Sequence, residues 1–235
     1  MSTFEFKYFS IKQEVAAVKV GTDAMLLGAF TSVDDAQHVL EIGTGTGVVS
    51  LMLAQKKSDL LVEALEIHRE TALEAIYNVR NSSFNSQINI QIIDFLHFQP
   101  SRKYDLIVSN PPYFENGLIP EDNKLRLAKH IDVLTVNSWF QKISEFLAFH
   151  GECWLIIPYE SLEAWTVIAN SNSLFLKKKI LLYSKPGVVK RVIISFCKIQ
   201  KPSEVINFQI RNVNGEYTNE YILLTNQYHN RAPIR

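Results

Sequence analysis

The chain has 235 residues, and its 24 basic side chains balance 24 acidic ones, so the formal net charge is zero. It contains no apolar run of about 18 residues, and its first residues lack the basic-then-apolar pattern of a signal peptide, which argues against a transmembrane helix and a secretory leader. We therefore expect one cytoplasmic domain with a sizeable core. Cys153 and Cys197 both lie in apolar, strand-like runs, which favours buried thiols over a disulfide or a metal site.

The neutral total conceals an asymmetry between the two halves of the chain. Residues 1–120 have an excess of five acidic groups, and residues 121–235 have an excess of five basic groups. The stretch from Ala164 to Ser203 contains no acidic residue and eight lysines or arginines. Such a cluster is either an ordinary solvated face or a surface for a polyanion, and charge alone favours the solvated face.

The first predicted helix begins near Thr22 or Asp23 and continues through the apolar stretch Ala24–Phe30. Either residue is a good N-cap, and the N-terminus of a helix can bind anions. The helix therefore either shapes the floor of a cofactor pocket, with Thr22 and Asp23 facing the cofactor, or serves only in packing.

A predicted strand ending at Ile42 leads into three alternating glycines, Gly43, Gly45 and Gly47, and then into a helix through about Gln55. A phosphate-binding loop would need a lysine here, and a dinucleotide-binding loop would need a wider final spacing. The observed spacing, with Glu41 two positions before the first glycine, favours S-adenosyl-L-methionine. Glu41 can face the cationic amino-acid end of that cofactor.

Acidic residues also end the next two predicted strands. Glu66 closes the strand from Leu61, and a carboxylate there can accept hydrogen bonds from both ribose hydroxyls. Asp94 closes the strand over residues 88–93, and its carboxylate can accept from the adenine amine of the cofactor. Each acid alone could be a helix cap, but three on successive strand ends favour a cofactor site.

The fourth predicted strand, Tyr104–Ser109, ends in Asn110, Pro111, Pro112, Tyr113 and Phe114. The prolines remove two backbone donors and stiffen the chain at the end of the strand, where open α/β sheets bind ligands. The amide oxygen of Asn110 and the carbonyl oxygen of Pro111 can accept the hydrogens of an exocyclic amine, and Tyr113 can stack on a flipped base. Alone, these residues could equally form a turn that ends a strand.

The remaining segments complete an alternating α/β pattern. A polar loop over residues 115–123 precedes a helical region to about Phe149, which Gly151 ends. A strand over 152–157, a helix over 162–171, an antiparallel pair over 180–183 and 192–196, and a packed helix over 217–229 follow. If the basic stretch binds RNA, its candidate residues are Lys177, Lys178, Lys179, Lys190 and Arg191.

The loop from Glu41 to Gly47, together with the corner from Asn110 to Tyr113, resembles class I S-adenosylmethionine-dependent amino methyltransferases. With the stretch from Lys19 to Ala29 and with Phe114, the chain resembles the bacterial tRNA1(Val) (adenine-37-N6)-methyltransferase family over nearly its whole length. The resemblance implies a Rossmann-like α/β fold, with a seven-stranded, mostly parallel sheet, an antiparallel last strand and helices on both faces.

It also implies an enzyme that forms N6-methyladenosine beside a tRNA anticodon, and we expect this enzyme to be a monomer without metal. Asn110, Pro111 and Tyr113 would be catalytic, and Pro112, Tyr113 and Phe114 would contact the base. Within one domain, residues 1–37 would cap the cofactor pocket, 38–200 would form the core and 201–235 an extension.

Other amino methyltransferases share the same corner. Glutamine methyltransferases that act on proteins carry a helical domain before the first strand, and only about 38 residues precede it here. Guanine-N2 rRNA methyltransferases and DNA adenine methyltransferases carry further domains. An RNA-binding module without activity would be expected to lack Asn110 or the glycines, and all of them are present.

Overall fold

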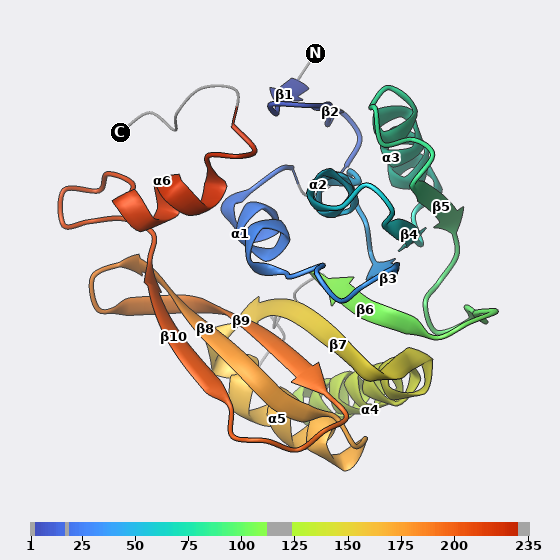
Figure 1. Cartoon of the computed structure of the whole chain (residues 1–235). Helices are drawn as coiled ribbons and strands as arrows, with labels where there is room; N and C mark the ends of the chain where they lie inside the picture. Colours follow the sequence, from blue (N-terminus) through green and yellow to red (C-terminus); the bar gives the residue numbers. More distant parts are fainter. Residues whose placement is uncertain (1–2, 17–18, 112–123, 230–235) are drawn as a thin grey trace.

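The computed structural model describes residues 3–16, 19–111 and 124–229, with side chains from residue 135 onward in the last range. A large sheet forms its centre (Figure 1). In chain order its strands are β3 (His38–Ile42), β4 (Leu61–Glu66), β5 (Ile88–Ile92), β6 (Tyr104–Ser109), β7 (Leu147–Pro158), β8 (Phe175–Lys185), β9 (Val188–Cys197) and β10 (Glu204–Gln209). Across the sheet their order is β10-β8-β9-β7-β6-β3-β4-β5.

This topology confirms the predicted mixed α/β class with a mostly parallel sheet. Strand β9 runs antiparallel to its neighbours β7 and β8, and the remaining neighbouring pairs are parallel. The expected count of seven strands is wrong by one, because β10 adds an eighth at the edge beside β8. This strand comes from the predicted C-terminal extension, which therefore shares the sheet of the core.

Helices cover both faces of the sheet (Figure 1). Their bounds are α1 (Thr22–Phe30), α2 (Val48–Lys56), α3 (Arg69–Arg80), α4 (Lys124–Phe146), α5 (Leu162–Ser171) and α6 (Asn219–Thr225). Residues of α1, α2 and α6 share one cluster of buried hydrophobic side chains, and residues of α4 and α5 share the other. The tail helix is shorter than the predicted range of 217–229.

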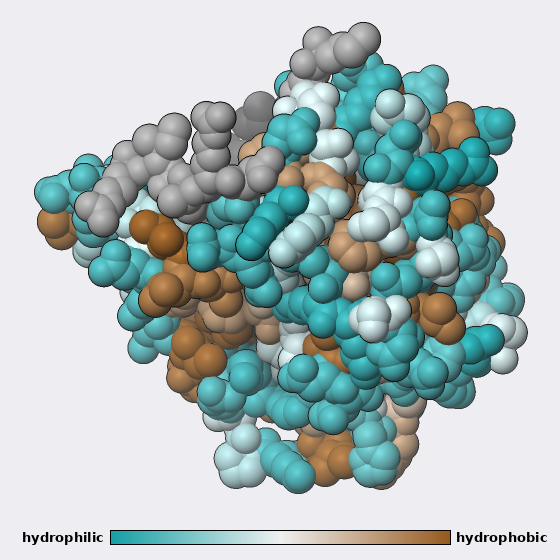
Figure 2. Space-filling model, turned by 45° about the horizontal axis from the view of Figure 1, so that its top comes forward, coloured by the Kyte–Doolittle hydropathy of each residue, from teal (hydrophilic) through white to brown (hydrophobic). Residues whose placement is uncertain are grey.

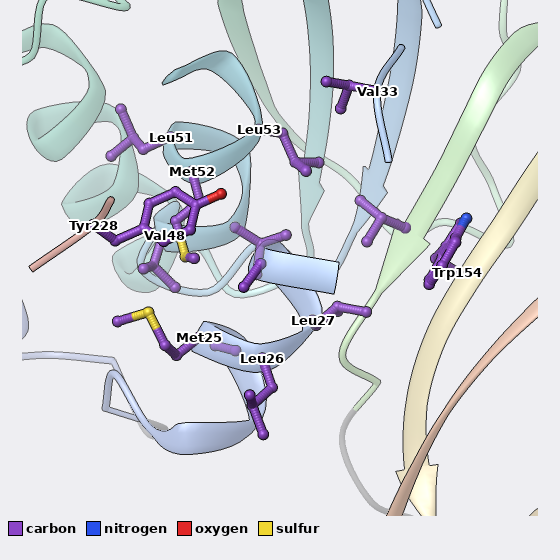
Figure 3. Packing of buried hydrophobic residues seen from close by; sticks show 14 of the residues in the cluster. Met25, Leu26, Leu27, Val33, Val48, Leu51, Met52, Leu53, Trp154 and Tyr228 are labelled. Carbon is purple, nitrogen blue, oxygen red and sulfur yellow. The ribbon is translucent and has the colours of Figure 1, made fainter. Parts of the chain in front are cut away.

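The packing of α1 on α2 is close. Leu26 and Leu27 of α1 and Leu51 and Met52 of α2 are fully buried in the same cluster, which Tyr228 also joins from the end of the chain (Figure 3). A Cβ atom added at Gly28 would lie 2.8 Å from the Met52 sulfur. The absence of a side chain at Gly28 therefore permits the approach of the two helices.

Gly151 is the clearest local difference from the sequence-based expectation. Helix α4 ends at Phe146, and Gly151 lies inside β7 instead of ending a helix. An added Cβ would lie 2.9 Å from the carbonyl oxygen of Asp105 and 3.0 Å from that of Tyr104. Because both atoms belong to the backbone of β6, the glycine is required by close approach of two strands at an irregularity in their register.

The first and the last segments that the structure describes meet on the face that carries α1 and α2. Strand β1 (Thr3–Glu5) pairs with β2 (Ser10–Lys12), and Phe6 forms an isolated bridge with His229. Hydrophilic side chains cover most of the face in Figure 2, broken by smaller apolar groups. Within residues 3–16, 19–111 and 124–229, no helix combines the length and apolar character needed to cross a membrane.

Candidate functional site

The glycine loop lies at the carboxyl end of the sheet, between β3 and α2. The amides of Gly43 and Thr44 both donate to the carbonyl of Leu65 at 2.9 Å, so the loop is attached to the end of β4. Gly43 and Gly45 have φ angles of 71° and 56°, in the left-handed region that favours glycine. A Cβ atom added at either position would meet nothing within 4 Å, so both glycines border open space where a ligand can approach the backbone.

Glu66 lies beside this loop, at the end of β4. One carboxylate oxygen accepts from the amide of Gly45 at 3.0 Å, and the other accepts from the amide of His68 at 2.9 Å. The side chain is 7% exposed. The fold thus holds a carboxylate in a fixed position at the edge of the glycine loop.

Asp94 lies next in the same row of strand ends. The amide of Ile93 donates to the carbonyl of Glu66 at 3.0 Å, which connects the end of β5 to the end of β4. The Asp94 carboxylate accepts from the amide of Leu96 at 2.9 Å and lies 3.2 Å from Nδ1 of His97. Asp94 therefore caps its own turn. It is half-buried and lies beside Glu66 in the row of strand ends.

Asn110 and Pro111 follow β6, on the other side of β3. Ser109 pairs with Ile42 in the sheet, and its hydroxyl donates to the carbonyl of Ile42 at 2.7 Å. This bond fixes the end of β6 against the start of the glycine loop. Asn110 is half-buried and Pro111 is buried. Pro112, Tyr113 and Phe114 lie outside the described residues.

Glu41 has a different environment from the one expected. It is 3% exposed, and one of its oxygens accepts from the hydroxyls of Thr44 and Ser50 and from the Ser50 amide at 3.0 Å. These contacts direct the carboxylate toward the first turn of α2. Burial raises the pKa of Glu41 from 4.5 to about 7; the hydrogen bonds oppose this rise and the nearby Glu66 carboxylate adds to it.

The raised pKa of Glu41 predicts a pH-dependent stability. Between about pH 4.5 and 7 the folded state retains a proton that the unfolded state has released, so the free energy of unfolding should fall as the pH rises through this window. The loss should be about 3 kcal/mol for a shift from 4.5 to about 7. Urea unfolding at pH 4.5 and pH 8 measures it, with Glu41→Gln as the non-titrating comparison. If the wild type and Glu41→Gln change equally with pH, Glu41 is not the source.

Thr22 and Asp23 lie at the start of α1. The N-cap of this helix is Gly21, so the prediction that Thr22 or Asp23 caps it is wrong. Asp23 forms an ion pair with Arg191 of β9 at 3.1 Å. A residue expected to face the cofactor thus contacts one expected to face the substrate. The pair connects α1 to β9 near the carboxyl end of the sheet.

The five basic candidates divide by their position along the strands. Ser109 is the last residue of β6, and the register can be followed from it across the sheet. It pairs with Leu155 of β7, which pairs with Ile194 of β9, which in turn pairs with Lys179 of β8. Residues 180–193, which we call the β8–β9 arm, extend past the end of β6 by about 20 Å, since β8 continues for six residues to Lys185. Figure 1 shows this hairpin projecting beyond the end of β6.

Lys190 and Arg191 belong to the arm, but Lys177, Lys178 and Lys179 do not. Lys177 forms an ion pair with Glu152, and Lys178 forms one with Glu204 at 2.9 Å. Lys179 lines an open cavity of about 450 Å³ beside α5. The structure therefore does not bring these three lysines to the site. Exposed Lys185, which was not among the candidates, does lie on the arm.

Sequence reasoning also missed three residues around the site. Ile67 follows Glu66 and is 57% exposed at the end of β4. Glu74 and Asn78 of α3 are 6% and 1% exposed, although polar residues in an amphipathic helix usually face solvent. Ile67 could have been identified from the sequence, because it directly follows Glu66 at the end of a predicted strand. The burial of Glu74 and Asn78 could not, because it depends on contacts with a segment distant in sequence.

Comparisons with known proteins show the family and the fold. Residues 16–162 match the methyltransferase small domain family. The chain is 37% identical over 230 residues to a tRNA1(Val) (adenine(37)-N6)-methyltransferase of Bacteroides fragilis (strain YCH46), covering 96% of this chain and 97% of the relative. It is 34% identical over 233 residues to a protein of the same description from Actinobacillus pleuropneumoniae serotype 7 (strain AP76), covering 96% of each.

Among solved structures, a predicted O-methyltransferase from Agrobacterium tumefaciens superposes with a TM-score of 0.67 at 19% identity, covering 90% of this chain and 99% of that one. A methyltransferase from Pyrococcus furiosus gives a TM-score of 0.58, also at 19% identity, with coverages of 81% and 89%. At this level of identity the structural likeness shows the fold alone.

Proposed function

The chain belongs to the family of the tRNA1(Val) (adenine(37)-N6)-methyltransferases, and from this premise we propose that it methylates N6 of adenine 37, beside the anticodon of that tRNA. The observation that carries the proposal is the position of Asn110 and Pro111, at the end of β6 and next to the glycine loop. We propose a cytoplasmic enzyme that acts as a monomer.

The described residues fit S-adenosyl-L-methionine as the methyl donor. Gly43 and Gly45 border open space where the cofactor can approach the backbone. We propose that the other cofactor-binding residues include Gly47, Thr22, Asp23 and Asn110. Glu66 would hold the ribose, Asp94 the adenine amine, and Ile67 would offer an apolar surface to the adenine ring. Glu41 would act mainly by holding the loop, because its contacts are to Thr44 and Ser50. The cofactor, when bound, supplies an electrophilic methyl group.

Asn110 and Pro111 would then orient the target amine. The N6 lone pair of adenine is delocalised into the ring, which makes the amine a poor nucleophile. Acceptance of its two hydrogens by the Asn110 amide oxygen and the Pro111 carbonyl oxygen returns electron density to nitrogen and fixes its direction. No general base is required, since the proton can leave after the transfer. We propose that Pro112, Tyr113 and Phe114 contact the flipped base.

The direct test is the chemical identity of the product. Unmodified tRNA incubated with the protein and labelled methyl donor should yield N6-methyladenosine after digestion to nucleosides. The label should disappear when adenine 37 is replaced by another base. Labelled N2-methylguanosine would contradict the assignment, as would transfer of label to a protein glutamine.

We further propose that the β8–β9 arm contacts the RNA outside the pocket. Lys185 and Lys190 are exposed on the part of the sheet that extends past Asn110, and lysines that contact phosphates release counterions. Arg191 lies on the same arm, but its pairing with Asp23 gives it a structural role as well. Lys177 and Lys178, each paired with a glutamate, provide a matched comparison on the same strand.

The double variant Lys185→Gln/Lys190→Gln should raise KM for tRNA several-fold with little change in kcat. A plot of log KM against log salt concentration should be less steep than for the wild type, with a slope smaller by roughly one to two units, because up to two phosphate contacts are lost. Steady-state kinetics across a salt series measures both quantities. Lys177→Gln/Lys178→Gln should leave the slope as in the wild type, and equal slopes for the two double variants would contradict the role of the arm.

A further inference from the structure

Two polar side chains of α3 are buried away from the row of strand ends. Glu74 and Asn78 are one helical turn apart, and so lie on the same face of the helix. Their exposures of 6% and 1% imply a cost in free energy unless each polar atom is hydrogen-bonded. Both residues bind an N-terminal segment more than 55 positions away in sequence.

Glu74 binds three successive backbone amides of that segment. Its carboxylate accepts from Glu14 at 2.6 Å, from Val15 at 3.1 Å and from Ala16 at 2.9 Å. Three donors converging on one buried carboxylate fix the course of the chain after β2. We call residues 12–16, which Glu74 and Asn78 hold together, the N-terminal clasp.

Asn78 joins this clasp to the glycine loop. Its side-chain oxygen accepts from the amide of Lys12 at 2.9 Å, and its side-chain nitrogen donates to the carbonyl of Lys12 at 2.9 Å. The same nitrogen also donates to the carbonyl of Thr46, again at 2.9 Å. Thr46 lies between Gly45 and Gly47, so a single amide group connects the N-terminal segment with the loop proposed to hold the cofactor.

The clasp is also connected to the start of α1. Gln13 accepts from the amide of Val20 at 2.8 Å, which brings the chain back just before Gly21 and Thr22. The next residue, Asp23, is paired with Arg191. Hydrogen bonds and adjacent residues of the chain therefore connect the glycine loop, through Asn78 and the clasp, with Val20, just before α1.

We infer that Glu74 and Asn78 are positioning residues that couple the N-terminal clasp to the glycine loop, so that cofactor binding and ordering of the clasp strengthen each other. The inference rests on the proposed function, in that the cofactor binds at this loop. Coupling between two sites is reciprocal by linkage. If the ordered clasp raises the affinity of the loop for its ligand by some factor, the bound ligand must shift the clasp toward its ordered state by the same factor.

The test compares Asn78→Ala with Asn81→Ala, the same substitution in the same chain segment. Asn81 donates its side-chain amide to the carbonyl of Tyr77 within its own helix region and is exposed. Calorimetry with S-adenosylhomocysteine should show a Kd about tenfold higher for Asn78→Ala, because its three hydrogen bonds no longer join the loop to the clasp. The Kd of Asn81→Ala should be unchanged.

Hydrogen exchange supplies a readout that general destabilisation does not mimic. In the wild type and in Asn81→Ala, S-adenosylhomocysteine should slow exchange at the amides of Lys12 and of residues 14–16. In Asn78→Ala the glycine loop should still be protected by the ligand, but the clasp amides should not respond. Should Asn78→Ala fail to fold, Glu74→Gln removes an acceptor at constant size and should show the same pattern with a smaller change.

Two results would overturn the inference, and they are distinguishable from each other. If the wild type binds S-adenosylhomocysteine and Asn78→Ala retains both its Kd and the response of the clasp, the coupling is absent although the cofactor site is real. If the wild type binds no S-adenosylhomocysteine, the proposed cofactor site fails and the coupling fails with it. Thermal unfolding of each variant confirms that the binding measurements are made on folded protein.

Discussion

Replacement of Asn110 by alanine should lower kcat for tRNA methylation by about 10²-fold to 10³-fold while KM changes little. The proposed contact of the amide oxygen with N6 strengthens as the new N–C bond forms, so its loss falls on the transition state. The rigid link between Ser109 and Ile42 keeps the end of β6 in place, so the substitution removes an acceptor without displacing the strand. Single-turnover methylation at saturating cofactor measures the effect directly.

Asn110→Asp is the sharper variant, because it retains an acceptor oxygen and adds a charge. It should keep part of the activity that Asn110→Ala loses. Asn89→Ala, in β5 at the far edge of the sheet, is the matched control and should behave as the wild type. If Asn110→Ala methylates tRNA at the wild-type rate in a single turnover, the corner serves only to end a strand.

Replacement of Glu66 by alanine should weaken S-adenosylhomocysteine binding by about 10²-fold or more. A carboxylate that accepts from two ribose hydroxyls makes two charge-assisted hydrogen bonds, each contributing about 1.5–3 kcal/mol. Part of the effect will come from the loop, because Glu66 also accepts from the amide of Gly45. Isothermal titration calorimetry gives the Kd, and the stoichiometry should remain one site.

Glu70→Ala removes the same charge four residues further on, at the first turn of α3, and should leave the Kd unchanged. Glu66→Gln retains the size of the side chain and separates loss of charge from loss of packing. Tight binding of NAD in place of S-adenosylhomocysteine would show that the glycine spacing was misinterpreted. Equal affinities for the wild type and Glu66→Ala would exclude the ribose contact.

The family, the fold class and the row of strand ends could be predicted because each depends on local spacing. Alternating glycines after a strand require a particular turn, and two prolines after Asn110 must end a strand. Parallel strands then bring Glu66, Asp94 and Asn110 to one edge of the sheet. The structure shows these residues in a row, and predicting that row required no knowledge of long-range contacts.

The misjudged residues are those whose environment depends on distant segments. Gly151 looked like a helix terminator, but its role follows from the carbonyls of Tyr104 and Asp105 on the neighbouring strand. Lys177 and Lys178 looked equivalent to Lys190, and only the register shows which of them lie beyond the end of β6. No role was predicted for Asn78, because nothing in the sequence of α3 indicates the clasp that buries it.

The contact between residues near Lys7 and residues near Tyr228 has a consequence for how the protein folds during synthesis. Tyr228 is fully buried among the side chains of α1 and α2, its carbonyl accepts from the amide of Lys7 at 2.8 Å, and the carbonyl of Gln227 accepts from the side chain of Gln55 at 2.9 Å. Synthesis proceeds from the N-terminus, so the first strands leave the ribosome long before the residues that cover them. The contacts of Gln227 and Tyr228 with Lys7, Gln55 and the side chains of α1 and α2 can therefore form only after residue 228 has left the ribosome.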